Sequence, residues 1–175
     1  MGCLAEVKGG LLVPCTYKAK EEALKGVELE LVPVEEVSDE IPLLVYNTLY
    51  LNWGVPYDPV EKWYDEAHGG HFLIARKDDG TLLGVCRLLP VMPETPTGIQ
   101  IRQVVVTADS QGMGIGRLLM LEAEKIGRAE GASELFLWSR MPAYRFYESL
   151  GYIYTSEPWT SKLTGLQHRT MTKYL

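Results

Sequence analysis

Hydrophobic and polar positions change period several times along the chain, which predicts a succession of strands and helices. Apolar and polar residues alternate from Val27 to Val34, as in a half-buried strand. Helical spacing follows from Glu35 to Leu51, with Ser38-Asp39 as a helix start. Further strands are expected at residues 72–75, 81–91, 100–106, 134–138, 152–155 and 169–174, and further helices at residues 60–67, 116–130 and 142–150.

Turn-forming residues separate these elements at several points. Asp78-Asp79-Gly80 predicts a hairpin turn, and Gly131 predicts the end of the helix before it. The run from Leu135 to Trp138 is apolar at every position, which predicts a strand buried on both faces. The order of elements indicates a mixed α/β (α+β) fold, a sheet of about seven strands with helices on its faces.

The chain of 175 residues fits one domain, which we expect over residues 27–175. Residues 1–26 are interpreted as an N-terminal extension, because Gly9-Gly10 and Pro14 interrupt any regular pattern there. Within it, residues 11–13 are expected to form a short strand and residues 21–25 a short helix.

The stretch from Val104 to Arg117 joins a β-branched strand, a polar turn, a glycine-rich loop and the start of a helix. N–H groups at a helix start have no intrahelical partner, and the helix dipole adds positive charge there. Small residues let an anionic ligand approach the backbone closely. The stretch therefore predicts a phosphate or pyrophosphate site, with a tight strand-to-helix turn as the simpler alternative.

Two common phosphate-binding patterns do not fit this loop. The third glycine of a dinucleotide-binding G-x-G-x-x-G pattern would fall on Arg117 or Leu119, and no Gly-Lys-Ser/Thr sequence of a triphosphate loop is present there. The pattern that remains, directly after the strand, is Gln111-x-x-Gly114-x-Gly116.

Composition narrows the function further. Net charge is −6 and there is no basic run, which argues against nucleic acid as a partner. No apolar run has membrane-spanning length, so no membrane partner is expected. The three cysteines (Cys3, Cys15 and Cys86) are widely spaced, which predicts neither a disulfide framework nor a metal site and favours the cytoplasm.

A second stretch places Ala143, Phe146, Tyr147 and Leu150 on one face of a short helix. That spacing alone is typical of a core stripe. The order Ala-x-x-Phe-Tyr-x-x-Leu-Gly-Tyr, together with the glycine-rich loop before it, also resembles the two motifs of the GNAT superfamily of acyl-CoA-dependent N-acyltransferases. Those motifs are Gln/Arg-x-x-Gly-x-Gly/Ala and Ala-x-x-Phe-Tyr-x-x-x-Gly-Phe/Tyr. The segments 165–171 and 54–58 are similar to small single-domain members.

The resemblance implies a mostly antiparallel GNAT-like sheet and transfer of an acetyl group from acetyl-CoA to a primary amine, by direct attack in a ternary complex. It implies that pantetheine lies along the strand residues Val104, Val105 and Val106, with the Val104 N–H polarising the carbonyl. It implies that the pyrophosphate lies on the loop residues Gln111, Gly112, Met113, Gly114, Ile115, Gly116 and Arg117. Arg140 stands where many members have Asn or Gln, and could instead pair with a CoA phosphate.

The catalytic groups follow from the same resemblance. Tyr147 is the candidate general acid, since a phenol of pKa about 10 is protonated at neutral pH and can donate to a thiolate. The general base stays open between His168, whose imidazole suits the task, and the carboxylates Glu134, Glu66 and Asp58.

The acceptor and the assembly state are also open. The aromatic residues Trp53, Tyr57, Trp63 and Tyr64 suggest an aromatic acceptor pocket, with core packing as the alternative. Cys86 is expected to be a core residue rather than a nucleophile. A homodimer is one arrangement that the last two strands permit. The alternative function is a non-catalytic acyl-CoA-binding regulatory domain of the same fold.

Overall fold

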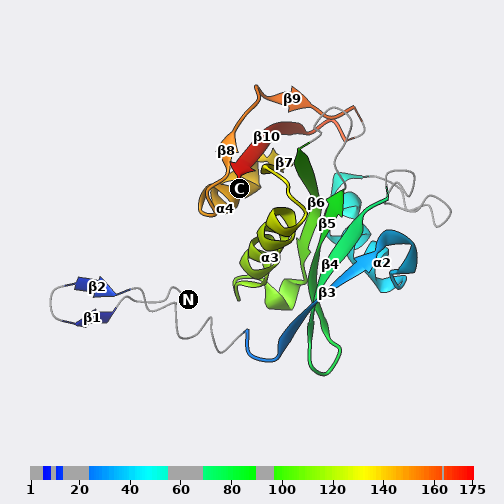
Figure 1. The fold of residues 1–175 in the computed structure, drawn as a ribbon, viewed down its shortest axis with the longest axis vertical. Coiled ribbons are helices and arrows are strands. Elements are labelled where there is room, and N and C mark those ends of the chain that lie inside the picture. Colours follow the sequence, from blue (N-terminus) through cyan, green and yellow to red (C-terminus); the bar gives the residue numbers. More distant parts are fainter. Residues whose placement is uncertain (1–5, 9–10, 14–23, 55–68, 90–96, 163) are drawn as a thin grey trace.

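The computed structural model describes residues 6–8, 11–13, 24–54, 69–89, 97–162 and 164–175. Its main sheet has eight strands, in the order β3-β4-β5-β6-β7-β10-β8 with β9 paired to β10. Of these pairings only β6 with β7 is parallel. The mixed, mostly antiparallel sheet flanked by helices is therefore confirmed (Figure 1).

The strands of the main sheet are β3 (Val27–Pro33), β4 (His71–Lys77), β5 (Leu82–Leu89), β6 (Gly98–Val106), β7 (Glu134–Arg140), β8 (Ile153–Tyr154), β9 (Trp159–Thr160) and β10 (Gln167–Tyr174). The helical elements are η1 (Val34–Glu36), α2 (Glu40–Val45), η2 (Tyr46–Tyr50), η3 (Leu51–Trp53), η5 (Ala108–Ser110), α3 (Ile115–Ala129), η6 (Met141–Ala143) and α4 (Tyr144–Glu148). Two short strands, β1 (Glu6–Lys8) and β2 (Leu11–Val13), pair with each other only.

Strand alternation divides the core between the two faces of the sheet. In β4, Leu73 and Ala75 belong to a cluster beneath α3 and α4, whereas Phe72 and Ile74 belong to a cluster beneath α2. Helix α3 presents Leu119, Met120 and Ala123, all fully buried, to the first cluster. The sheet is thus covered on both faces (Figure 1).

The neighbouring strands β6 and β7 in the middle of the sheet pair over only part of their length. Strands β6 and β7 pair from Gly98 with Glu134 to Ile101 with Leu137, and no pairing between the described residues of these strands continues beyond that point. The register of β6 with β5 also shifts between Val85 and Arg87. Gln103 lies opposite this shift and has φ 50°, the one non-glycine residue in the described chain with a positive φ. This β-bulge turns the end of β6 away from β7, so that residues 104–106 pair with no described residue of β7 and form a free strand edge.

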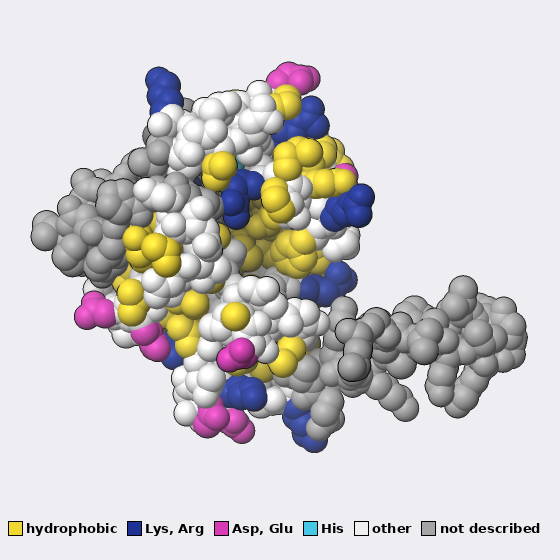
Figure 2. Space-filling model, turned by 180° about the vertical axis from the view of Figure 1, so that it is seen from behind, with side chains coloured by type: hydrophobic (Ala, Val, Ile, Leu, Met, Phe, Trp, Pro, Cys, Tyr) yellow, Lys and Arg dark blue, Asp and Glu magenta, His cyan; other side chains and the backbone are white. Residues whose placement is uncertain are grey.

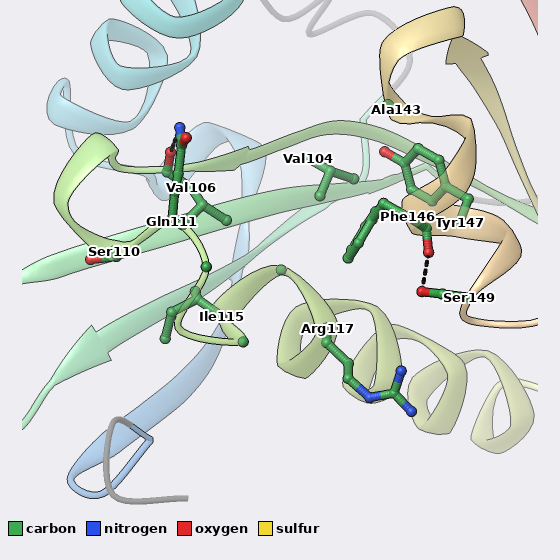
Figure 3. A pocket seen from close by; sticks show the side chains of 13 residues that line it. Val104, Val106, Ser110, Gln111, Ile115, Arg117, Ala143, Phe146, Tyr147 and Ser149 are labelled. Atoms are coloured by element: carbon green, nitrogen blue, oxygen red, sulfur yellow. Dashed lines mark hydrogen bonds between the residues drawn. The ribbon is translucent and has the colours of Figure 1, made fainter. Parts of the chain in front are cut away.

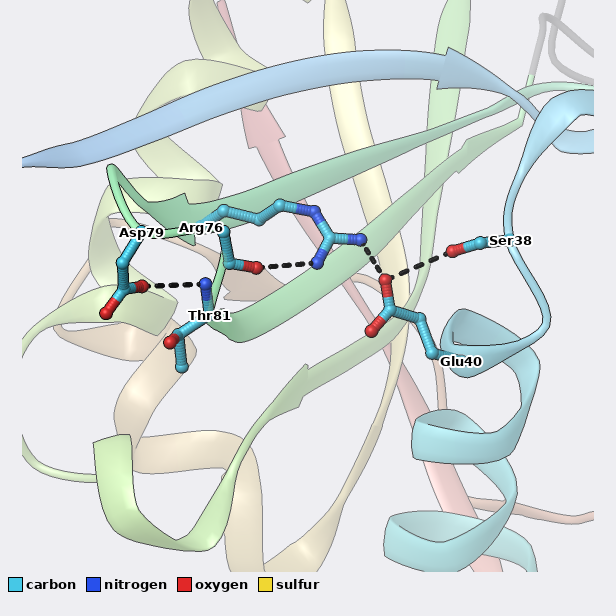
Figure 4. Close-up of polar contacts among 6 residues, drawn as sticks. Ser38, Glu40, Arg76, Asp79 and Thr81 are labelled. Atoms are coloured by element: carbon cyan, nitrogen blue, oxygen red, sulfur yellow. Dashed lines mark hydrogen bonds and ion pairs between the residues drawn. The ribbon is translucent and has the colours of Figure 1, made fainter.

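A polar cluster joins α2 to the β4–β5 hairpin (Figure 4). Arg76 of β4 forms an ion pair with Glu40 and donates to the Gly80 carbonyl at 3.1 Å. Ser38 donates to the same Glu40 carboxylate at 3.1 Å. In the hairpin turn, the Thr81 N–H donates to Asp79 Oδ1 at 2.9 Å. The hairpin turn predicted from the sequence is therefore confirmed.

Of the other elements predicted from the sequence, some are confirmed, some are wrong and some lie outside the described residues. The helix predicted over 35–51 is a chain of short helical turns rather than one helix, and β9 had not been predicted. The strand 134–138 was expected to be buried on both faces, which is wrong, because Trp138 is 45% exposed. Trp138 comes one residue after the point at which the pairing of β6 with β7 ends, so its side chain is not covered there. The short strand 11–13 is confirmed as β2, whereas the helix predicted over 60–67 and most of that over 21–25 lie outside the described residues.

Figure 2 views the molecule from the side opposite to Figure 1. Hydrophobic and Lys or Arg side chains meet around a hollow near the centre of this face. Among the described residues, no helix is long and apolar enough to cross a membrane.

Candidate functional site

The glycine-rich loop connects β6 to α3 through η5. Gly112 and Gly114 have φ 77° and 95°, conformations that L side chains rarely adopt. Gly114 caps α3, and its carbonyl accepts the first helical hydrogen bond, from the Leu118 N–H at 2.9 Å. Ile115, Gly116 and Arg117 lie between Gly114 and Leu118. Their N–H groups therefore have no intrahelical acceptor and are available to a ligand.

A cavity of about 580 Å³ lies against this loop (Figure 3). Its walls come from β6, the loop, the first turn of α3, and α4. Predicted cofactor-binding residues that line it are Val104, Val106, Gln111, Gly112, Gly114, Ile115, Gly116, Arg117 and Tyr147. Ser110, Ala143, Phe146 and Ser149 also line it and had not been assigned to the site. Predicted residues that do not line it are Val105, Met113 and Arg140.

Gly116 keeps the helix start close to α4. A Cβ added there would lie 3.3 Å from Cζ of Phe146 and 3.6 Å from Cγ2 of Val106. A glycine therefore lets the Phe146 ring close one wall of the cavity without displacement. Figure 3 shows Phe146 and Tyr147 projecting from α4 toward Val104.

Tyr147 is a largely buried residue of this cavity, only 9% exposed, and it carries a phenol hydroxyl. Its ring packs edge-on against Phe146, with ring centroids 5.0 Å apart. Burial raises the pKa of the Tyr147 phenol, a nearby Cys86 raises it further, and the charge of Arg140 acts in the opposite direction. Tyr147 is consequently a protonated hydrogen-bond donor at neutral pH.

A second cavity, of about 370 Å³, lies on the other side of Tyr147. Val104 and Tyr147 line both cavities, so the two meet at the free edge of β6. The second cavity has an aromatic and basic character, and it is lined by Leu49, Tyr50, Ile101, Arg102, Gln103, Val104, Leu137, Trp138, Tyr147, Trp159, Ser161, Lys162, Thr164 and His168. Its position next to the first cavity suits a second substrate.

His168 of β10 reaches the second cavity with a defined orientation. Its Nδ1 lies 3.0 Å from the Leu166 carbonyl oxygen, which only accepts hydrogen bonds, so a neutral His168 carries its proton on Nδ1. Its ring stacks on Trp159, with centroids 5.0 Å apart and planes inclined by 21°. The lone pair of Nε2 is then available as a proton acceptor.

The remaining predicted groups lie elsewhere. Arg140 lines a third cavity, of about 300 Å³, together with His168 and Arg169. Burial lowers the pKa of Arg140, partly offset by Tyr147, so the two side chains interact electrostatically. Glu134 begins β7 at the paired end of the strands and lines none of the three cavities.

Part of the predicted site lies outside the described residues: Asp58, Glu66, Tyr57, Trp63, Tyr64 and the side chain of Trp53. Of the residues that line the second cavity, Val104, Tyr147 and His168 had been predicted as site residues, whereas the others, among them Tyr50, Trp138, Trp159 and Lys162, had not. Trp138 carried a signal, because a large aromatic residue in the strand beside the motif strand is suited to a ligand wall. The others are brought together only by the fold.

Cys86 of β5 is fully buried, and burial raises the pKa of its thiol to about 12. It lines none of the three cavities. Its expected place in the core is confirmed.

Comparison with known proteins agrees with this geometry. The family model described as the acetyltransferase (GNAT) family matches residues 41–152. A UPF0039 protein of Schizosaccharomyces pombe is 32% identical over 140 residues, which cover 79% of this chain and 87% of that protein.

Two solved structures have the same fold. An acyl-CoA N-acyltransferase from Pseudomonas aeruginosa has TM-score 0.65 at 18% identity, covering 83% of this chain and 99% of that chain. A GNAT family acetyltransferase from Elizabethkingia anophelis with acetyl-CoA bound has TM-score 0.64 at 14% identity, covering 86% and 99%. With a family model that spans residues 41–152, this chain belongs to the acetyltransferase (GNAT) family.

Proposed function

We propose that the protein is an N-acetyltransferase that moves the acetyl group of acetyl-CoA to a primary amine by direct attack in a ternary complex. The observation that carries this proposal is the meeting of two cavities at Tyr147 and Val104. One cavity has a helix N-terminus suited to a pyrophosphate, and the other has room for an acceptor. Two substrates bound in this way would meet without an acyl-enzyme.

The first cavity would hold CoA by its backbone. The pyrophosphate would accept hydrogen bonds from the N–H groups of Ile115, Gly116 and Arg117, assisted by the dipole of the 15-residue helix α3. Pantetheine would extend along the free edge of β6 and add to the sheet like a strand. The Val104 N–H would face that edge and polarise the thioester carbonyl.

The chemistry divides between two side chains. Nε2 of His168 would take a proton from the amine as its nitrogen attacks the carbonyl carbon, because Nδ1 is already committed to Leu166. When the carbon–sulfur bond breaks, the Tyr147 hydroxyl would donate its proton to the CoA thiolate. The charge of Arg140 opposes the effect of burial and so makes that donation easier.

The substitution Tyr147→Phe tests the acid, with Tyr152→Phe as its matched control. Tyr152 is also a buried tyrosine, 1% exposed, but it lines none of the three cavities. We expect Tyr147→Phe to lower kcat by about 100-fold, the lower end for general acid catalysis, with little change in the Kd of CoA. Release of CoA thiol from acetyl-CoA is measured across a panel of primary amines.

Tyr152→Phe should keep wild-type kcat. Equal kcat for wild type and Tyr147→Phe would refute the role of Tyr147. If the wild-type protein binds acetyl-CoA yet releases no thiol with any amine, the non-catalytic acyl-CoA-binding function replaces the proposal.

A further inference from the structure

The imidazole of His168 borders two cavities. It lines both the second cavity, of about 370 Å³, and the third, of about 300 Å³. An imidazole with space beside it can turn about its Cβ–Cγ bond, because that torsion has broad minima. Such a turn would carry Nδ1 away from the Leu166 carbonyl. A base that accepts a proton on one particular nitrogen therefore needs a further contact that fixes its ring.

The pairing of β9 with β10 places Trp159 next to that ring. Trp159 is directly opposite His168 in the antiparallel register, and the side chains of directly opposite residues are close neighbours on one face of a sheet. The two rings stack with centroids 5.0 Å apart and planes inclined by 21°. This contact opposes rotation of the imidazole, because a rotated ring would lose the stacked arrangement.

The turn between β9 and β10 holds the hydrogen-bond acceptor of His168 in place. The Leu166 carbonyl oxygen lies 3.0 Å from His168 Nδ1 and also accepts from the Ser161 N–H at 2.9 Å. The Gly165 N–H donates in return to the Ser161 carbonyl at 2.8 Å. The acceptor of the imidazole proton is thus fixed within the same hairpin that carries Trp159.

Trp159 is itself supported from the middle of the sheet. Its ring contacts Trp138 of β7 edge-on, with centroids 5.2 Å apart and planes inclined by 85°. The Arg102 guanidinium of β6 lies 4.5 Å from the Trp138 ring centroid, a cation–π distance. These contacts form a continuous line from β6, close to Val104, to the imidazole on β10. They relate the position of His168 to the strand along which the acyl donor is proposed to bind.

Resting on the acetyl transfer proposed above, we propose that Trp159 is a positioning residue, which holds the His168 imidazole so that Nδ1 donates to Leu166 and Nε2 accepts the proton of the attacking amine. Trp159 acts through His168 and forms no bond with the reacting atoms. Without the stack, Nε2 would be placed less accurately, and small displacements of a catalytic group lower the rate of the chemical step.

Trp159→Val removes the ring and keeps a side chain that favours a strand, whereas Trp159→Phe keeps a smaller ring. We expect Trp159→Val to lower kcat for thiol release by about tenfold, to change the KM of the amine by less than about threefold, and Trp159→Phe to recover most of kcat. Tyr174→Leu is the matched control, since it removes an exposed aromatic ring of β10 that lines none of the three cavities. It should keep wild-type kcat and KM.

The orientation of the imidazole is measured without substrates, from the nitrogen-15 NMR shifts of its ring at alkaline pH. His168→Gln identifies the signals of His168 among the three histidines of the chain. Wild type and Tyr174→Leu should show a protonated Nδ1 and an unprotonated Nε2. Trp159→Val should show a mixture of both tautomers. If Trp159→Val does not fold, Trp159→Leu takes its place with the same expected results.

The two measurements separate the inference from the proposed function. A mixture of tautomers in Trp159→Val supports the inference even if no amine supports thiol release and the proposed acetyl transfer fails. An unchanged tautomer, or thiol release at wild-type kcat in Trp159→Val, overturns the inference and leaves the acetyl transfer standing. A raised KM with unchanged kcat also overturns it, because Trp159 would then bind the acceptor instead of positioning His168.

Discussion

Gly114→Ala tests whether the shape of the loop creates the CoA site. Gly114 has φ 95°, and an added Cβ would meet only Leu24 Cδ1, at 3.8 Å. The substitution therefore strains the backbone without a steric clash. A left-handed conformation costs a non-glycine residue about 1–2 kcal/mol, and the lower entropy of the unfolded alanine chain offsets about 0.5 kcal/mol of it.

The expected net loss is about 1 kcal/mol, or about 2–4 °C in Tm for a domain of this size. If the backbone relaxes away from φ 95°, the N–H groups that follow Gly114 lose their common direction. Loss of one charge-assisted hydrogen bond would raise the Kd of CoA about tenfold. Differential scanning fluorimetry measures the first effect, and calorimetric titration with CoA measures the second.

Gly131→Ala is the matched control at the other end of α3. Gly131 has φ 77°, and an added Cβ would meet nothing within 4 Å. It lines none of the three cavities. Both variants should therefore lose similar stability, and Gly114→Ala alone should bind CoA more weakly. An unchanged Kd in Gly114→Ala, or equal weakening in both variants, would refute the assignment of the loop.

Three further predictions concern buried or paired groups. Glu124→Ala should lower the unfolding free energy by about 2–3 kcal/mol in chemical denaturation, because the Glu124 side chain is 8% exposed and both its oxygens accept from Lys173 at 2.7 Å; a loss below about 0.5 kcal/mol contradicts this. Cys86, with its thiol pKa raised to about 12 by burial, should resist iodoacetamide at pH 8 until the protein unfolds, as judged by peptide mass mapping. The hydrogen bond from Arg76 lowers the pKa of Glu40. The Glu40 carboxylate should therefore add under about 1 kcal/mol to the unfolding free energy above the pKa of Glu40 in the unfolded chain, and this contribution should disappear as pH falls through its pKa in the folded protein. A difference in unfolding free energy between wild type and Glu40→Gln that is independent of pH would contradict this prediction.

The features that the sequence predicted well depend on residues close together in the chain. The loop from Gln111 to Gly116 could be predicted because glycines at positive φ and a following apolar helix determine it locally. The same holds for the turn at Gly80 and for the apolar face of residues 143–150, where Tyr147 of α4 and Leu150 just beyond it are both buried. In each case the determining residues lie within one turn or one helix.

The second cavity depends on contacts between distant parts of the chain. Its walls come from η2, β6, β7 and the segment from β9 to β10, more than a hundred residues apart in sequence at the extremes. Tyr50 and Trp159 approach each other only because the sheet places β6, β7 and β10 side by side. No periodicity within one element carries that information. The same reason explains why Trp138 was expected to be buried.

The bulge at Gln103 links the split of the sheet to the position of Val104. Ile101 and Val104 both pack against the cluster beneath α3, although residues three apart in a regular strand face opposite sides of a sheet. Val105 correspondingly packs beneath α2. One extra residue in β6 therefore turns the Val104 side chain toward the α3 side of the sheet, while Arg102 lines the second cavity.

Val104 lines both cavities, so the bulge affects the walls of each. If β6 were regular, we would expect its pairing with β7 to continue past Ile101 and to occupy the edge at Val104. The positive φ of Gln103 costs about 1–2 kcal/mol in a side-chain-bearing residue, and the paired strands on either side compensate for that cost. In the proposed function, this strained residue accompanies the open edge at which an acyl donor and an acceptor would meet, with Tyr147 beside them.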